Sequence, residues 1–399
     1  MDFAETVEDQ ALRKTVAEIA GRFGGAYYAA RAQAREPCTE LWQALGEAGF
    51  IGVNLPEEYG GGGGGLAELA IVCEETAAQG CPLTLLLVSS GVSAEVLARY
   101  GSPECKQRWL PGIAAGTSKM VFAITEPDAG SNTHKLSTTA TRDGNARDGN
   151  GWVLRGTKYY ISGVNEAEAI LVVARTGVDA ATGEGAKDSG ATGHGRLSLF
   201  VVPTDAPGLV ARPLPVDVML PERQFTLHFD DVRLGADAIV GAEGDGLRQV
   251  FHGLNPERIT GAASGVGVAR YALARAAEYA RTRTVWDEPI GSHQGVSHPL
   301  AKAAIETELA ALMTRKAAWQ HDHGMSAGEA ANMAKYAAAE AAIAAVDQAI
   351  QTHGGNGVST EYGLIPLWGL ARLLRIAPVN REMVLNYVAQ HTLGLPRSY

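Results

Sequence analysis

The clearest chemical feature of the sequence is a short segment, residues 125–131, which reads TEPDAGS. Thr125 and Ser131 place a hydroxyl group at each end, and the small residues between them leave backbone N–H groups open to a ligand. Such a segment suits a flat polar heterocycle or a phosphate group. A simple turn would have a similar composition, so the segment alone does not decide between a ligand site and a turn.

A carboxyl group in the sequence LNPER, residues 254–258, is a candidate general base. Asn255 and Pro256 predict the N-cap and the first turn of a helix, because Asn caps helices well and Pro is tolerated at their first position. Glu257 would then lie in the first turn, where the helix dipole favours a negative charge. That arrangement by itself would give Glu257 only a structural role.

Two further groups of residues could bind an anion or an aromatic ring, although each also has an ordinary structural explanation. Arg283 could form a surface salt bridge, and His293 could be a hydrogen-bonded structural histidine. The glycine-rich turn at 354–357 could end a helix, or it could let backbone amides approach a pyrophosphate closely. Only the joint order of these groups along the chain favours a shared function.

The hydrophobic pattern divides the chain into three parts that would position these residues. The expected parts are an N-terminal helical domain, a central β-barrel-like domain and a C-terminal four-helix bundle, at residues 1–118, 119–238 and 239–399, which is an α+β fold. In the first part, Leu41 and Leu45 illustrate the helical spacing of apolar residues. The glycine run at 60–65 cannot lie inside a helix without a large entropic cost, so we expect a loop there.

The middle part changes to the period of strands. Phe225, Leu227 and Phe229 alternate with polar residues, which is typical of a half-buried strand. The mostly apolar run at 197–202 is expected to be a central strand. Two glycine-rich polar stretches look like long connections between strands, at residues 143–151 and 178–195.

The helical period returns in the last part. Ile305, Leu309, Leu312 and Trp319 fall on one helix face, and the alanine-rich stretch at 327–349 favours close packing of helices. An all-helical bundle fits both patterns.

The composition favours a large core and argues against several classes of ligand. The chain has 399 residues, 46% of them apolar, which supports two or three domains. Its formal net charge of −10 opposes binding to nucleic acid and to anionic membranes. The four cysteines form no Cys-x-x-Cys pair, so we expect buried thiols and no metal site. The acidic N-terminus and the lack of a run of about 18 apolar residues predict a cytoplasmic protein without a membrane span.

The segment at 122–131 resembles the flavin-binding signature of the acyl-CoA dehydrogenases, whose members share a Thr-Glu-Pro-x-Ala-Gly-Ser core there. The sequence GTKYYIS at 156–162 resembles the family strand that lies against the flavin ring. Tyr160 stands where a tryptophan is frequent, and a second aromatic ring can stack in its place. The later groups resemble the family's Arg-x-x-Phe, His-Gln and Gln-x-x-Gly-Gly-x-Gly elements, in the family's order and over nearly the whole chain.

The resemblance implies FAD as the cofactor. The residues expected to contact the flavin of their own chain are Phe122, Ile124, Thr125, Gly130, Ser131, Tyr160, Ile161 and Ser162. Arg283 and the glycine-rich turn, with Gln351, Gly354 and Gly355, are expected to reach the flavin of a neighbouring subunit, and Trp286, His293 and Gln294 are also expected to contact the flavin. A site shared in this way implies a homodimer or a homotetramer.

The resemblance also identifies a catalytic base. Most family members carry a glutamate in a loop near the C-terminus, but Pro378 stands at that position here, and proline can neither accept a proton nor donate an N–H to the thioester oxygen. A minority, including the isovaleryl-CoA dehydrogenases, places the glutamate on a bundle helix within Leu-Asp-Leu-Glu-Arg, which matches Glu257. The resemblance implies that Glu257 is the base and that Ser131, Asn255 and Arg258 bind the substrate. We expect the rival carboxyl group, Glu382, to be structural.

The function that follows is FAD-dependent removal of two hydrogens from the α and β carbons of an acyl-CoA, with electron-transfer flavoprotein as the redox partner. An acyl-CoA oxidase that uses oxygen is an alternative, although two-domain oxidases are usually longer. A flavin-bound binding protein with a degenerate site is another, since one family branch is associated with DNA. The acidic composition opposes that alternative.

Overall fold

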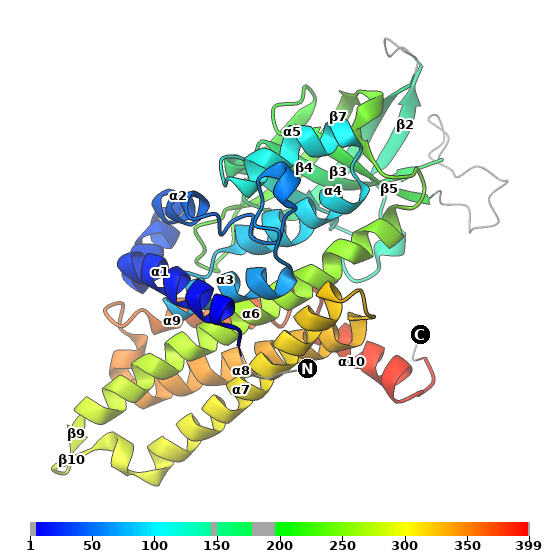
Figure 1. Ribbon diagram of the computed structural model, residues 1–399. Helices are drawn as coiled ribbons and strands as arrows, with labels where there is room; N and C mark the ends of the chain where they lie inside the picture. The colour runs from blue at the N-terminus through cyan, green and yellow to red at the C-terminus, as the bar shows by residue number, and fades with distance from the viewer. Residues whose placement is uncertain (1–4, 145–149, 178–195, 398–399) are drawn as a thin grey trace.

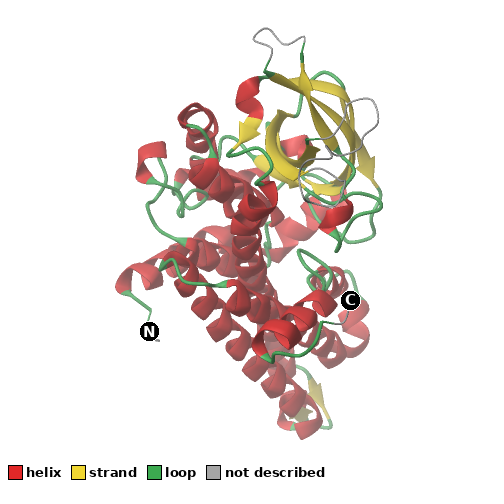
Figure 2. Cartoon of the chain, turned by 90° about the vertical axis from the view of Figure 1, so that its right-hand side faces the viewer, coloured by secondary structure: helices red, strands yellow, loops and turns green. Residues whose placement is uncertain are grey.

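The computed structural model describes residues 5–144, 150–177 and 196–397. Helices form the N-terminal part, a sheet domain follows at one end of the molecule, and long helices extend away from it (Figure 1). Figure 2 shows the same arrangement from the side, with the curved sheet above the helices. The predicted α+β fold class is therefore confirmed.

The described residues of the N-terminal part contain five α-helices, and the first and the last of them begin at residues whose side chains cap them, Thr6 and Ser102. The helices are α1 (Val7–Ala34), α2 (Thr39–Glu47), α3 (Leu66–Ala78), α4 (Glu95–Tyr100) and α5 (Pro103–Ala114). The Thr6 hydroxyl accepts from the backbone N–H of Asp9, and the Asp9 carboxylate accepts from the backbone N–H of Thr6, which is a capping box. The glycine run at 60–65 connects a short 3-10 turn (Glu57–Tyr59) to α3, so the predicted loop is confirmed.

The middle part is one eight-stranded sheet. Its strands are β1 (Met120–Ala123), β2 (Thr139–Asp143), β3 (Gly151–Ser162), β4 (Ala169–Thr176), β5 (Arg196–Pro203), β6 (Leu209–Leu214), β7 (Gln224–Leu234) and β8 (Ile239–Val240). They pair in the order β6-β7-β3-β2-β4-β5-β8, and β1 adds to β4 in parallel, with Met120 opposite Ala169. The alternation of Phe225, Leu227 and Phe229 is confirmed, because all three side chains are buried. Residues 145–149 and 178–195 of the two expected connections lie outside the described residues.

The C-terminal part consists mainly of three long antiparallel helices that lie side by side (Figure 1). The helices are α6 (Gly246–Thr282), α7 (Gln294–Asp322), α8 (Gly328–His353), α9 (Leu364–Leu373) and α10 (Arg381–Tyr387), with a hairpin of β9 (Thr284–Val285) and β10 (Glu288–Pro289) between α6 and α7. The alanine-rich stretch forms α8, and its small side chains, such as Ala338, Ala342 and Ala345, are buried. Small side chains let helix backbones approach closely, as the composition predicted.

One local prediction is wrong. Asn255 does not cap a helix, and Pro256 does not begin one, because α6 starts at Gly246 and continues through Pro256. A proline inside a helix removes one backbone hydrogen bond, but α6 buries residues on both sides of it, including Val250 and Ile259. Packing against the rest of the molecule outweighs the local signal. Glu257 therefore lies inside a long helix, where the helix dipole does not account for its charge.

The apolar residues predicted on one face of α7 do share that face, but the face is not the core. Ile305 is 62% exposed and Leu309 is 61% exposed, whereas the buried side of α7 carries small residues such as Ala310 and Thr314. Contiguous apolar surface of this kind marks an interaction site more often than a solvated face.

The four cysteines, Cys38, Cys73, Cys81 and Cys105, are buried and unpaired. In the ranges that the structure describes, no helix is both long and apolar enough to cross a membrane. Within the same ranges, no cluster of His, Cys, Asp and Glu side chains is suited to a metal ion.

Helix α6 approaches α3 at Gly267, and this contact gives a stability test. A Cβ atom at Gly267 would overlap the Glu74 carbonyl oxygen and lie 2.6 Å from the Ala77 Cβ. We expect Gly267→Ala to lower the free energy of unfolding by about 2 kcal/mol, since overpacking outweighs the higher helix propensity of alanine. Urea unfolding measures this change. The control is Gly295→Ala on α7, where a Cβ meets nothing within 4 Å; an equal loss in both variants would contradict the packing argument.

Candidate active site

The segment at 125–131 is held against the sheet by a buried carboxylate, Glu126. Its Oε2 accepts from the backbone N–H and the hydroxyl of Ser137, at 2.6 and 2.7 Å. Its Oε1 accepts from the backbone N–H of Thr138 at 3.0 Å and from Lys158 Nζ at 2.9 Å. Burial alone would raise the pKa of Glu126, but Lys158 and then the Ser137 contacts outweigh it and hold that pKa well below its usual range.

Lys158 comes from β3 and is completely buried. Besides Glu126, its ammonium group donates to the Ile124 carbonyl at 2.9 Å. One residue further along β3, the backbone N–H of Tyr159 donates to the Thr125 carbonyl at 2.8 Å. The segment and the strand, predicted separately from the sequence, are thus joined by an ion pair and two hydrogen bonds to backbone carbonyls.

The exposed side of this joint fits a flat ligand. The register between β3 and β7 shifts between Lys158 and Ile161, and within this irregularity Tyr160 adopts a positive φ of 58° and is 54% exposed. Bulges of this kind redirect side chains. Ser131 is also exposed, and a Cβ at Gly130 would meet nothing within 4 Å. An aromatic ring, hydroxyl groups and open space above a glycine fit the polar heterocycle of a flavin.

The other residues expected at the flavin differ in exposure. Phe122, Ile124 and Thr125 are half-buried, as is Ser162, whose Oγ accepts from Gln224 Nε2 at 2.9 Å. Ile161 is 2% exposed and belongs to the main hydrophobic core. Its side chain therefore packs inside the protein, and only its backbone is available to a ligand.

Glu257 lies on α6, where it is partly shielded from solvent. Its side chain is half-buried, and burial raises the pKa of its carboxyl group to about 7, although the charges of Arg258 and Lys335 act in the opposite direction. Arg258 Nη1 donates to Asn255 Oδ1 at 2.8 Å, so the two residues expected to bind substrate contact each other. The site thus has one carboxyl group under the influence of two cations, of which Arg258 is half-buried and Lys335 is buried.

The C-terminal loop connects this carboxyl region with the hydroxyl-rich segment. Pro378 lies beside α6, since a Cβ built at Gly261 would be 3.8 Å from its Cδ. Lys335 Nζ donates to the carbonyl of the next residue, Val379. Asn380 Nδ2 donates to Ser131 Oγ at 2.6 Å, while Asn380 Oδ1 accepts from the backbone N–H of Met383 and caps α10. Residues far apart in the sequence therefore meet at Ser131.

The later sequence motifs, which begin at Arg283, lie at the other end of the molecule from the sheet. Arg283, Trp286, His293 and Gln294 surround the β9–β10 hairpin, which both figures place opposite the sheet. Trp286 is 84% exposed. The glycine-rich turn is close by, because Tyr279, near the end of α6, stacks on His353 at 4.2 Å between ring centroids and accepts from Asn356 Nδ2 at 3.0 Å. Gln351, Gly354 and Gly355 thus join the hairpin group, and one chain does not bring this group to its own Tyr160.

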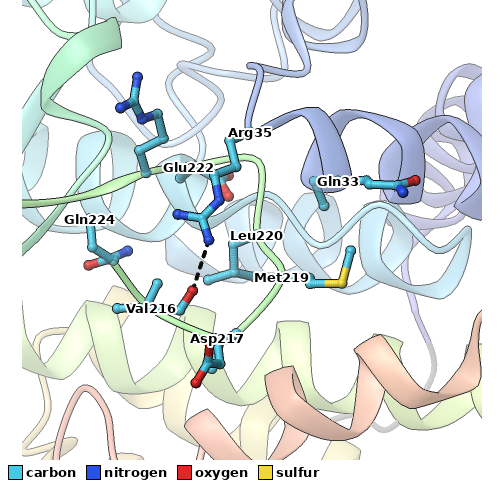
Figure 3. A pocket seen from close by; sticks show the side chains of 11 residues that line it. Gln33, Arg35, Val216, Asp217, Met219, Leu220, Glu222 and Gln224 are labelled. Carbon is cyan, nitrogen blue, oxygen red and sulfur yellow. Dashed lines mark hydrogen bonds between the residues drawn. The ribbon is translucent and has the colours of Figure 1, made fainter. Parts of the chain in front are cut away.

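The structure contains a third polar region that was not predicted from the sequence (Figure 3). A cavity of about 300 Å³ lies between the end of α1 and the connection from β6 to β7, where Arg35 Nη2 donates to the Val216 carbonyl at 3.2 Å. Its lining includes Glu222, which is 4% exposed and accepts from the backbone N–H of Thr84 at 2.8 Å. Burial, and then the charge of Glu166, raise the pKa of Glu222 to about 7. No motif in the sequence marks this region.

Three family profiles match the chain in order. They describe the N-terminal, middle and C-terminal domains of acyl-CoA dehydrogenases and match residues 6–117, 121–232 and 244–393. The chain belongs to the acyl-CoA dehydrogenase family. It is 56% identical over 399 residues to acyl-CoA dehydrogenase FadE12 of Mycobacterium tuberculosis, covering 100% of this chain and 99% of that protein.

Solved structures of this family share the whole fold. Butyryl-CoA dehydrogenase from Megasphaera elsdenii matches with a TM-score of 0.89 and 26% identity, over 98% of this chain and 100% of that chain. A glutaryl-CoA dehydrogenase from Mycobacterium smegmatis in complex with FADH2 matches with a TM-score of 0.88 and 26% identity, over 99% and 96%. The acyl-CoA dehydrogenase described here is therefore an enzyme of an FAD-dependent family.

The ion pair beneath the segment gives a test of the cofactor site. Lys158→Met would leave the Glu126 carboxylate buried without its cation, which costs about 3–5 kcal/mol in comparable buried pairs. We expect the purified variant to contain less FAD per chain and to unfold at lower urea concentration.

The matched control for this test is Arg155→Met, also on β3, because the ion pair of Arg155 with Asp231 is about half exposed. That variant should keep both its FAD and its stability. A Lys158→Met protein with the FAD content and unfolding curve of the unchanged enzyme would show that the pair does not support the cofactor site.

Proposed function

We propose that this enzyme removes the α proton and the β hydride of an acyl-CoA thioester, with Glu257 as the base for the α proton. The observation that carries this proposal is the setting of Glu257, a carboxyl group inside a helix, with a raised pKa, near the half-buried Arg258 and the buried Lys335. A structural carboxylate gains nothing from such a position, whereas a base gains proton affinity.

The surroundings of Glu257 suit proton abstraction at neutral pH. Removing water from a carboxylate raises its pKa and makes it a stronger base toward a bound carbon acid. Arg258 and Lys335 limit this rise, so that a large share of Glu257 is ionised at pH 7. Glu382, the rival, is exposed in the first turn of α10 and lacks these surroundings.

The cofactor would be held by the hydroxyl groups of Thr125, Ser131 and Ser162 and by the ring of Tyr160. When bound, FAD supplies the acceptor for the hydride that leaves the β carbon. The protein's own part is to position the Tyr160 ring through the Glu126–Lys158 ion pair and to hold the acyl chain near Glu257. Arg258 and Asn255, which contact each other, would bind the substrate as one unit.

The loop at Pro378 is proposed to polarise the thioester less than the usual family loop does. Pro378 has no N–H group, and the side-chain amide of Asn380 already donates to Ser131. Fewer donors at the thioester oxygen stabilise the developing negative charge less well. The cations beside Glu257 would then carry a larger part of the electrostatic stabilisation.

We also propose a homo-oligomer in which Arg283, Trp286 and the glycine-rich turn complete the flavin site of a partner subunit. The β9–β10 hairpin lies at the opposite end of the molecule from β3, the strand that carries Tyr160 (Figure 1), and this separation and the 84% exposure of Trp286 support the arrangement. The exposed apolar face of α7 supports it independently, since association would cover Ile305 and Leu309. Electron-transfer flavoprotein is the proposed acceptor of the electrons.

Replacing the proposed base tests the mechanism directly. Glu257→Gln should keep the yellow flavin but slow its anaerobic bleaching by an acyl-CoA by a factor of about 100 or more, because glutamine cannot accept the proton. Stopped-flow absorbance with a panel of acyl-CoAs measures the rate. Glu382→Gln is the matched control and should bleach normally; normal bleaching by Glu257→Gln would rule out this base.

The pH dependence provides a second test. The base must be ionised, so kcat/KM should rise from about pH 6 to about pH 8 with a midpoint near the raised pKa of Glu257, about 7. The same profile should be absent in Glu257→Gln. A midpoint near 4.5, the ordinary value for a glutamate, would contradict a buried base.

A further inference from the structure

Lys335 is a buried cation that is bonded to the C-terminal loop as well as lying near the proposed base. It lies on α8 and is 3% exposed, although lysine is rarely buried without a partner. Among the described residues, its ammonium group forms one hydrogen bond, to the Val379 carbonyl, and no ion pair within 4.0 Å. A neutral donor would be enough to satisfy a carbonyl oxygen, so the positive charge needs a separate explanation.

The charged groups around Lys335 indicate what the charge does. Burial, and then Arg258, lower the pKa of Lys335 to about 8, while Glu257, Glu340 and Glu382 act in the opposite direction. Glu340 is already paired with Arg375 and Arg381, and Glu382 is exposed. Glu257, on α6, interacts electrostatically with Arg258 and Lys335, and its carboxyl group accepts no hydrogen bond among the described residues.

The hydrogen bond to Val379 has a second consequence. Val379 stands between Pro378, which lies beside Gly261 of α6, and Asn380, which contacts Ser131. A single ammonium group on α8 therefore holds the loop that touches the hydroxyl-rich segment and also places a charge beside the carboxyl group on α6.

We propose that Lys335 is a positioning residue for the reaction, which fixes the C-terminal loop at Val379 and stabilises the ionised form of Glu257. This inference rests on the proposed function of Glu257 as the base. Through Lys335, α8 would directly affect the pH at which Glu257 becomes ionised. Before Gln351, this helix contains no predicted site residue. The loop position and the ionisation of Glu257 are then coupled through one side chain.

The test is an infrared titration of the Glu257 carboxyl group in the holoenzyme with isotope-labelled glutamate and without substrate. The Glu257 band is the one that disappears in Glu257→Gln. Lys335→Met should raise its titration midpoint by about one pH unit, since a nearby opposite charge shifts a carboxyl pKa by that order. Lys335→Arg, which keeps the charge and the donors, should leave the midpoint within a few tenths of a unit.

Two further variants separate the roles of charge and hydrogen bond. Lys335→Gln keeps a donor for Val379 without the charge, so the midpoint should rise while the loop stays protected in hydrogen exchange at residues 379–383. Lys302→Met removes an exposed lysine of α7 and should change neither measurement. An unchanged midpoint in a folded Lys335→Met or Lys335→Gln protein would overturn the proposal.

The two proposals can fail separately. The infrared titration needs no turnover, so a shifted midpoint in an enzyme whose flavin no acyl-CoA bleaches would leave the coupling intact and reject the proposed function. Normal bleaching that depends on Glu257, together with an unshifted midpoint, would support the proposed function and reject the role of Lys335. In the functional enzyme, the pH profile of bleaching should move upward by the same amount in Lys335→Met.

Discussion

The contact between Glu126 and Lys158 is the interaction on which the rest of the cofactor region depends. Both side chains are enclosed by protein, so neither charge could remain there without the other. Because the same ammonium group also binds the Ile124 carbonyl, the end of β1 and the bulged part of β3 cannot move independently. The buried Glu126–Lys158 ion pair therefore helps to position the exposed ring of Tyr160 and the hydroxyl of Ser131, although the pair itself is not accessible to a ligand.

A second constraint operates in the helical part. Because α6 continues through Pro256, Glu257 lies inside a long helix and not at a helix end. The loop at residues 376–380 is then the part that adjusts, and it is held from both sides, by Lys335 and by Ser131. The proposed base thus lies on a long helix and the loop packs beside it, which suits a site with proline at the position of the usual loop carboxylate.

The sequence predicted the three-part fold because the helical and strand periods are local features of the chain. The alternation at Phe225, Leu227 and Phe229 and the glycine run at 60–65 depend only on neighbouring residues. Lys158 was not predicted as a buried cation, because a lysine in a strand resembles a solvent-facing residue until its partner is known. The same limit explains the wrong helix start at Asn255: capping signals are local, whereas the burial of Val250 and Ile259 depends on other helices.

Within one chain, the sheet that carries the segment at 125–131 and the β9–β10 hairpin lie at opposite ends of the molecule, and this separation affects how the enzyme retains its cofactor. In the proposed assembly, FAD binds across a subunit boundary, so each bound molecule stabilises the association of the chains, and each association event strengthens the binding of FAD. Cofactor occupancy then depends on protein concentration as well as on FAD concentration. In that assembly, the exposed Trp286 at the end of the long helices would contact the flavin of a partner, so the oligomer and not the single chain would form the complete binding site.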